Sequence, residues 1–138
     1  MQTRIFPGRF ENLEEISHFV IQAAEKAGLD DSAVYAVELA VDEAATNIIE
    51  HAYQGEGLGE ICCSFEIIQE GLKVMLQDWG VPFNPLEVPE PILGAPLDQI
   101  QSSGLGLFFI RKLMDEVRFE FSIEKGNTVT MIKRKKQS

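Results

Sequence analysis

Three polar side chains recur at every fourth position within residues 31–51: Glu43, Asn47 and His51. Because an α-helix advances about 100° per residue, this spacing would place a carboxylate, an amide and an imidazole in one stripe along a helix. An amide oxygen can bind magnesium, which keeps several waters while bridging phosphates, so one protein ligand can suffice. Glu43, one turn before Asn47, would then be placed as a general base. A solvated helix edge is the alternative interpretation.

The next residue suited to chemistry ends a β-rich run. Asp78 is followed by Trp79-Gly80-Val81-Pro82, where glycine and proline turn the chain. A carboxylate at a strand end could accept a hydrogen bond from the exocyclic amine of a nucleobase, and Gly80 would leave room for a flat ring. Asp78 and Gly80 are therefore candidates for binding a base.

A glycine-containing segment runs directly into a helical pattern. Residues 102–107 read Ser-Ser-Gly-Leu-Gly-Leu, and apolar side chains then recur at helical spacing as far as Asp115. Unpaired N–H groups at a helix N-terminus carry partial positive charge and can bind phosphate where glycines allow close approach. The P-loop motif is absent, and Gly104-x-Gly106 lacks the preceding strand and the further glycine of a dinucleotide site. Two glycines alone do not establish a phosphate site.

Length and composition limit the possible classes of protein. The 138 residues, 45% of them hydrophobic, suffice for one domain with one core, so we expect a single domain over residues 1–138. No stretch reaches the roughly 18 apolar residues of a membrane span, and the first residues lack the pattern of a signal peptide. Adjacent Cys62 and Cys63 in a strand-like run would be strained as a disulfide, which favours a reducing compartment. We expect a cytoplasmic protein with no membrane contact.

The net charge of −10 is unevenly distributed along the chain. Up to Ile110 there are 4 basic and 18 acidic residues, whereas from Arg111 onward there are 8 basic and 4 acidic ones. An acidic body repels nucleic-acid phosphates, so we expect no nucleic-acid partner. The basic run at residues 133–136 is interpreted as a solvated tail.

Periodicity predicts the elements that would carry these residues. Asn12 and Glu15 fit a capping box for a first helix, which Gly28 ends, and one of Asp30, Asp31 and Ser32 should cap the second helix. A hairpin with Gln69-Glu70-Gly71 as its connection follows, and residues 84–103, rich in proline, are interpreted as a lid. The predicted strands are 3–10, 60–68, 72–78, 117–123 and 128–133, and the predicted helices are 12–27, 31–51 and 107–115. This order predicts an α+β fold with helices packed on one face of a largely antiparallel sheet.

Four short segments, taken in order, resemble the boxes of a known family. They are Glu43-x-x-x-Asn47, Asp78-x-Gly80-x-Pro82, Gly104-x-Gly106 and Gly126-x-Thr128. Together they resemble the Bergerat fold of GHKL, or histidine kinase-like, ATPases, which serves gyrase, heat-shock chaperones, histidine kinases and mismatch-repair proteins. Residues 47–53 and 78–85 most resemble the bacterial anti-sigma factor serine-protein kinases, and the likeness covers nearly the whole chain.

The resemblance implies a two-layer α/β sandwich with a mixed, mostly antiparallel sheet, helices on one face and an ATP lid. It implies that Glu43 is the general base, that Asn47 binds magnesium and that Asp78 reads the adenine amine. Gly80 would leave space beside the adenine, residues 104–107 would wrap the phosphates, and Thr128 would support the adenine. For His51, a place near the phosphates, a supporting contact and a loop anchor all stay open. The implied nucleotide-binding set is Asn47, His51, Asp78, Gly80, Phe83, Ser103, Gly104, Leu105, Gly106, Leu107 and Thr128.

Three positions depart from the family pattern. Ser103 and Leu105 stand in a phosphate loop that is usually richer in glycine and often flanked by arginine, so phosphoryl transfer could be slow or absent. Asn127 stands where a second glycine is often found, a milder change because asparagine tolerates left-handed turn conformations.

The function implied by the resemblance is that of an ATP- and Mg²⁺-dependent serine kinase. Such a protein binds a sigma factor and phosphorylates a serine on an anti-anti-sigma (antagonist) protein, and it is expected to be a homodimer. The alternative is a nucleotide-dependent binding module that sequesters a regulatory partner without significant kinase activity. Glu43 favours the enzyme, because it supplies a base one helical turn from the metal ligand.

Overall fold

The computed structural model describes residues 1–82 and 105–136, leaving out the side chains of residues 105 and 106. Residues 84–103, predicted as a lid, therefore lie outside the described part of the chain. The strands are β1 (Gln2–Pro7), β2 (Glu60–Ile68), β3 (Gly71–Asp78), β4 (Glu116–Ser122) and β5 (Gly126–Arg134). The helices are α1 (Leu13–Lys26), α2 (Asp31–Asn47) and α4 (Leu105–Leu113), with a 3₁₀ turn at Phe10–Asn12 and a π-helical turn at Ile48–Ala52.

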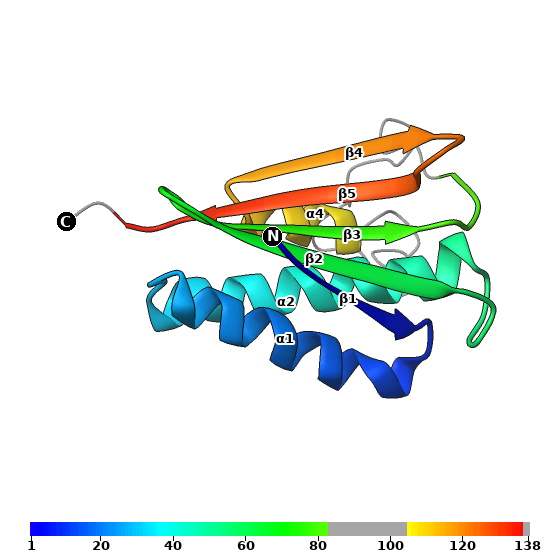
Figure 1. Cartoon of the computed structure of the whole chain (residues 1–138), viewed down its shortest axis with the longest axis horizontal. Coiled ribbons are helices and arrows are strands. Elements are labelled where there is room, and N and C mark those ends of the chain that lie inside the picture. The colour runs from blue at the N-terminus through cyan, green and yellow to red at the C-terminus, as the bar shows by residue number, and fades with distance from the viewer. Residues whose placement is uncertain (83–104, 137–138) are drawn as a thin grey trace.

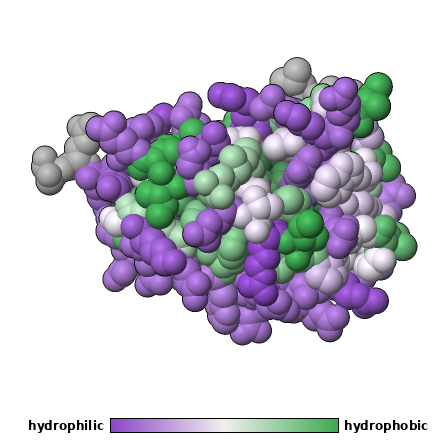
Figure 2. Space-filling view, in the orientation of Figure 1, coloured by the Kyte–Doolittle hydropathy of each residue, from purple (hydrophilic) through white to green (hydrophobic). Residues whose placement is uncertain are grey.

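The five strands form one sheet in the order β1-β2-β3-β5-β4, and each of the four pairings between them is antiparallel. The three helices lie together on one side of this sheet, with α1 and α2 side by side and α4 behind β3 and β5 (Figure 1). This arrangement confirms the predicted α+β fold with helices on one face of the sheet. The opposite face carries no helix of the described chain, and Figure 2 shows hydrophobic residues there among mainly hydrophilic ones.

The core lies between the sheet and the helices. In β3 every second side chain is fully buried, namely Leu72, Val74 and Leu76, because strand side chains alternate between the two faces. Val37 and Val41 of α2 are likewise fully buried. Each such side chain contributes about 1.5–3 kcal/mol when it leaves water, and this burial fixes both the strand register and the rotation of α2.

The end of α1 and the start of α2 agree with the sequence prediction, and Asn12 is the N-cap of α1, as predicted. Asp30 caps α2, since its Oδ1 accepts a hydrogen bond of 2.8 Å from the N–H of Ala33, and Gly28 ends α1 with φ of 81°. The capping box predicted at Asn12 is wrong. The preceding 3₁₀ turn leaves Asn12 in a helical conformation, and its side chain donates to Glu15 Oε1 instead of accepting from the backbone.

The second helix changes from α-helical to π-helical geometry near its C-terminal end. It is α-helical as far as Asn47 and then widens into the π-helical turn, in which the N–H of Tyr53 donates to the carbonyl of Ile48 over 2.9 Å. The predicted helix 31–51 is thus present, but not as one regular α-helix. A π-helical turn holds one extra residue per turn and often accompanies a functional site.

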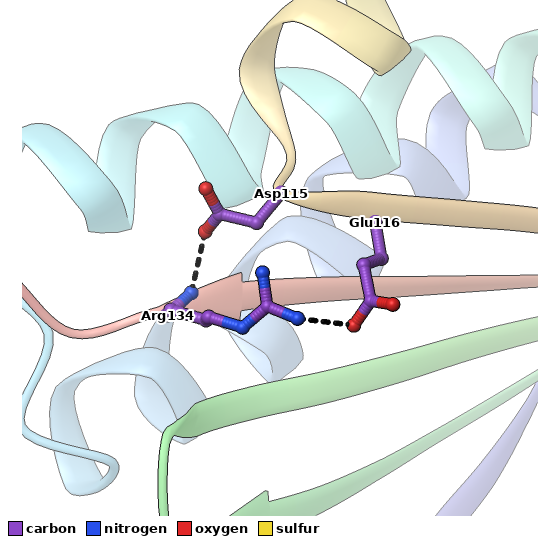
Figure 3. A network of polar contacts seen from close by, with 3 residues as sticks. All are labelled: Asp115, Glu116 and Arg134. Atoms are coloured by element: carbon purple, nitrogen blue, oxygen red, sulfur yellow. Dashed lines mark hydrogen bonds and ion pairs between the residues drawn. The ribbon is translucent and has the colours of Figure 1, made fainter.

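The two hairpins confirm the predicted antiparallel pairing with shifted ends. Ile68 pairs with Gly71, so Gly71 is the first residue of β3 and the connection is Gln69-Glu70 alone. A Cβ on Gly71 would lie 2.1 Å from the carbonyl oxygen of Lys133 on β5, and this close approach accounts for the glycine. The far ends of β4 and β5 are joined by Arg134, whose N–H donates to Asp115 and whose guanidinium pairs with Glu116 at 2.6 Å (Figure 3).

No helix in residues 1–82 or 105–136 is long and apolar enough to cross a membrane. Cys62 and Cys63 are both free thiols, as the strain argument predicts.

Candidate functional site

A cavity of about 180 Å³ lies where the end of α2, the end of β3, the start of α4 and the hairpin β4–β5 meet. It brings together five residues that the sequence predicts for one site: Asn47, His51, Asp78, Leu107 and Thr128. Its remaining walls are mostly apolar, as in small-molecule sites generally. These walls are formed by Ala44, Ile48, Ala52, Val81, Pro82, Ile110, Phe119, Glu120, Asn127 and Val129.

Asp78 provides the buried carboxylate of the cavity, with 4% of its surface exposed. Its Oδ1 accepts hydrogen bonds from the N–H of Gly80 at 2.9 Å and from Asn127 Nδ2 at 2.8 Å. Burial raises the pKa of Asp78, and these two hydrogen bonds act in the opposite direction. Both described partners use Oδ1, which leaves Oδ2 as an acceptor for a ligand.

Asn127 is the residue of this site that the sequence analysis missed. It belongs to β5 and lies directly opposite Asp78 on β3, so it occupies a strand and not the left-handed turn considered for it. Its Nδ2 also lies 3.2 Å from the carbonyl oxygen of Gly80 and 3.3 Å from that of Val81. A signal for it was present in the sequence. Val129 and Met131 are the buried hydrophobic residues of β5, and extending their alternation by one step reaches Asn127.

Thr128 lines the cavity, but it is the neighbour of Asn127 and therefore alternates to the other face of β5. It pairs with Gln77, and it also lines a depression on the uncovered sheet face together with Gln77, Cys62 and Ser64. Asn127 is thus a second candidate, beside Thr128, for the side chain that contacts the adenine.

The turn at residues 79–81, which follows Asp78, is hydrogen-bonded to Ala52 at the end of the π-helical turn. The N–H of Val81 donates to the carbonyl of Ala52 over 2.8 Å, and a Cβ on Gly80 would lie 2.4 Å from the same oxygen. Gly80 is therefore required by its contact with Ala52, a reason additional to the room for adenine that we expected. The Tyr53 hydroxyl accepts from the N–H of Trp79 at 3.1 Å and donates to the carbonyl of Glu60 at 2.6 Å.

Of the three polar residues predicted to form a stripe, Glu43 and Asn47 belong to α2. Asn47 lines the cavity directly, whereas Glu43, one turn earlier, is half-buried and lies outside the lining. Burial raises the pKa of Glu43, and the carboxylates of Asp42 and Glu50 raise it further. A carboxylate with a raised pKa is a better proton acceptor, which suits a general base.

His51 lies at the rim of the cavity with 69% of its side chain exposed. Its Nε2 is 3.9 Å from the carboxylate of Glu50, a loose contact between neighbours. The π-helical turn contains His51 but not Glu43 or Asn47, so the three residues do not share one regular stripe.

The start of α4 supplies the last wall. The helix spans Leu105–Leu113, so it begins and ends two residues before the predicted helix 107–115. Leu107 and Ile110 are buried against the cavity. Leu105 and Gly106 form its first turn, whose N–H groups have no partner within the helix. Phe83, Ser103 and Gly104, also predicted for the site, lie outside the described residues.

The donor set fits a weakly held magnesium ion better than a protein-caged metal. Among the described residues no three His, Cys, Asp or Glu side chains cluster as metal ligands. Asn47 offers one amide oxygen at the cavity wall, and magnesium bound with substrate phosphates needs only one or two protein ligands.

Comparison with known proteins identifies the class to which this fold and site belong. Residues 6–133 match the family model of the histidine kinase-like ATPase domain, and the chain belongs to that family. The catalytic domain of histidine kinase ThkA aligns with 99% of this chain and 100% of its own, with a TM-score of 0.56 and 18% identity. A crystal structure of RsbU and RsbW domains from Mycobacterium tuberculosis aligns with 100% of this chain and 34% of its own, with a TM-score of 0.61 and 12% identity. At these identities the two structures show the fold alone.

A curated relative narrows the class to one group. The serine-protein kinase RsbW of Listeria innocua is 34% identical over 114 residues, which cover 80% of this chain and 71% of the relative. Within the histidine kinase-like ATPases, the chain is therefore a member of the RsbW family of serine-protein kinases.

Proposed function

We propose that this protein is an anti-sigma factor and serine kinase, which binds a sigma factor and transfers the γ-phosphate of ATP to a serine of an antagonist protein. The observation that carries the proposal is the meeting of a buried carboxylate, Asp78, and a helix bearing Glu43 and Asn47 at one cavity. The first suits recognition of a base, and the second suits phosphoryl transfer.

The base is held at the Asp78 end of the cavity. An ionised carboxylate only accepts hydrogen bonds, so Asp78 favours a base with an exocyclic amine, such as adenine. The apolar side chains of Ile48, Ile110 and Val129 line the same cavity and would pack against the ring. A volume of about 180 Å³ is below the roughly 300–1,000 Å³ of pockets that enclose a whole drug-sized ligand, so the sugar and phosphates extend beyond these walls.

The phosphates would lie between Asn47 and the first turn of α4, whose N–H groups have no partner within the helix and favour negative charge. Asn47 contributes its side-chain oxygen to magnesium, which offsets phosphate charge when bound. Glu43 would accept the proton of the attacking serine hydroxyl as the new oxygen–phosphorus bond forms and the bond from the γ-phosphorus to the β–γ bridging oxygen breaks, with ADP as the leaving group. Its raised pKa suits that role. Positioning and electrostatics carry most of such a transfer.

The partners are proposed from the family membership, since the relatives named serine-protein kinases act on protein serines. We propose a homodimer in the cytoplasm, without nucleic-acid or membrane partners. Exposed hydrophobic side chains on the strands, among them Ile5, Ile67 and Phe121, are available for contacts between proteins. The mass of the protein in solution, with and without ATP, tests the dimer.

The kinase proposal is tested by incubating the pure protein with γ-labelled ATP, magnesium and a cytosolic extract of the source organism. We expect one small protein to become labelled, with the label on serine after acid hydrolysis. If ATP binds and no protein is labelled in active extract, the kinase proposal is wrong, and the binding module without transfer takes its place.

A further inference from the structure

The nitrogen of the Asn127 side chain faces three acceptors. These are Asp78 Oδ1 at 2.8 Å and the carbonyl oxygens of Gly80 at 3.2 Å and Val81 at 3.3 Å. An amide nitrogen carries two hydrogens, whereas the amide oxygen carries none. Rotating the amide by 180° would turn its oxygen toward three other oxygens, so this network fixes the orientation of Asn127.

The orientation leaves the other end of the amide without a partner. Asn127 is 9% exposed, and its Oδ1 is buried and receives no hydrogen bond from the described residues. Buried acceptors are nearly always paired, and an unpaired one costs about 1–3 kcal/mol. Because Asn127 lines the cavity, a molecule bound there is placed to satisfy this oxygen.

The sheet register explains why this residue and no neighbour reaches Asp78. Asn127 is the cross-strand partner of Asp78, and directly paired side chains lie on the same face. Gly126 lets β5 begin this close, since its φ is 69° and a Cβ there would lie 2.3 Å from the carbonyl oxygen of Asp78. Thr128, one residue further, pairs with Gln77 on the strand beside it.

We propose that Asn127 is a positioning residue for base recognition: it fixes the Asp78 carboxylate and the turn 78–81 in the geometry that reads an exocyclic amine, and its Oδ1 offers the bound base a second acceptor. The inference rests on the proposed binding of ATP in this cavity. It assigns to Asn127 the supporting role that the sequence led us to expect of Thr128.

The proposal has a specific thermodynamic consequence. If Asn127 acts through recognition of the amine, its loss weakens binding of ATP and leaves binding of purine riboside triphosphate, which lacks that amine, nearly unchanged. If Asn127 only supports the fold, its loss weakens both ligands by the same factor. The ratio of the two dissociation constants therefore separates positioning from general structural support.

The experiment measures Kd for both nucleotides by calorimetry in wild type, Asn127→Ala, Asn127→Asp and the control Thr130→Ala. Thr130 lies on the same strand, pairs with Met75 and Arg118, and does not line the cavity. We expect wild type and Thr130→Ala to prefer ATP by about tenfold or more, as hydrogen bonds to a charged group allow. Both Asn127 variants should lose most of that preference. Asn127→Asp keeps the shape of the side chain but turns an oxygen toward Asp78 Oδ1 and the two carbonyl oxygens, so thermal melting must show that each variant is folded before its Kd values are compared.

The outcomes separate this inference from the proposed function. A wild-type ATP preference that persists in both folded Asn127 variants overturns the role of Asn127 and leaves the nucleotide site standing. Failure of wild type to bind either nucleotide overturns the proposed function, and the inference with it. A control variant that loses the preference as fully as the Asn127 variants also overturns the assignment to Asn127.

Discussion

Asn127 Nδ2 lies 2.8 Å from Asp78 Oδ1, so the buried carboxylate at the end of β3 is held from the neighbouring strand β5. Asp78 is 4% exposed, and a carboxylate buried this deeply is expensive unless its partners offset the lost hydration. The buried Asp78 carboxylate therefore lowers the free energy of unfolding, but it gives the apolar cavity a hydrogen-bond acceptor in a fixed position.

Asp78→Asn should raise stability and abolish ATP binding. Burial raises the pKa of Asp78 above the unfolded value of 3.8, so the folded state binds the proton of this carboxyl more tightly than the unfolded state does. The free energy of unfolding therefore falls as pH rises through the folded pKa and the buried carboxyl becomes ionised. At pH 7 a neutral amide avoids that loss, and its oxygen can still accept from Asn127. We expect a higher Tm for the variant at pH 7 than for wild type, and a smaller difference at pH 4, in thermal melts. A lower Tm at pH 7 would contradict the account of Asp78.

Asn47→Ala should weaken ATP binding only when magnesium is present. The substitution removes the one amide oxygen that the cavity wall of α2 offers to the metal. Calorimetry with magnesium, and again with excess chelator, should show a loss for the variant in the first condition and equal affinities in the second. Equal wild-type affinity in both conditions would rule out the metal role of Asn47.

Gly80→Ala should damage the site through the end of α2. The new Cβ would lie 2.4 Å from the carbonyl oxygen of Ala52, so the turn must move, at a cost of about 1–3 kcal/mol. Gly28→Ala is the matched control: it introduces left-handed strain of about 1–2 kcal/mol at φ of 81°, where the added Cβ meets nothing closer than 3.6 Å. We expect both variants to lose stability in urea unfolding, while only Gly80→Ala loses ATP affinity. Comparable ATP affinity in the two variants would refute the link between Gly80 and the site.

Much of the fold follows from periodicity, because the spacing of apolar residues reports directly which face is buried. The strand predicted at residues 72–78 is present, with Leu72, Val74 and Leu76 buried, and the helix predicted from residue 31 buries Val37 and Val41 on its inner face. The resemblance to the family boxes predicted that Asn47 and Asp78 belong to one nucleotide site, and in the structure both residues line the same cavity.

The features that could not be predicted depend on distances between segments far apart in the sequence. The contact of Gly80 with Ala52 arises only when the end of β3 meets the end of α2. The π-helical turn adds one residue to a turn without altering the apolar pattern, so His51 still appeared to follow Asn47 regularly.

Asn127 is a different case, because the alternation of Val129 and Met131 indicated its buried side. It was missed from the sequence because the predicted strand began at residue 128, whereas β5 begins at Gly126. The alternation of the strand is the same in both cases, but a strand that starts at residue 128 leaves Asn127 outside it and its buried side chain unassigned.

The central claim is that Glu43 is the base of a protein serine kinase, and phosphoryl transfer by Glu43→Ala tests it most directly. The control is Glu38→Ala, which removes a carboxylate five residues earlier on the same helix, about 140° around the helix axis from Glu43. With γ-labelled ATP, magnesium and the protein substrate found in extract, we expect Glu43→Ala to bind ATP like wild type and to transfer phosphate about 10²–10⁴-fold more slowly. Glu38→Ala should transfer at the wild-type rate. Transfer by Glu43→Ala at the wild-type rate would contradict the account.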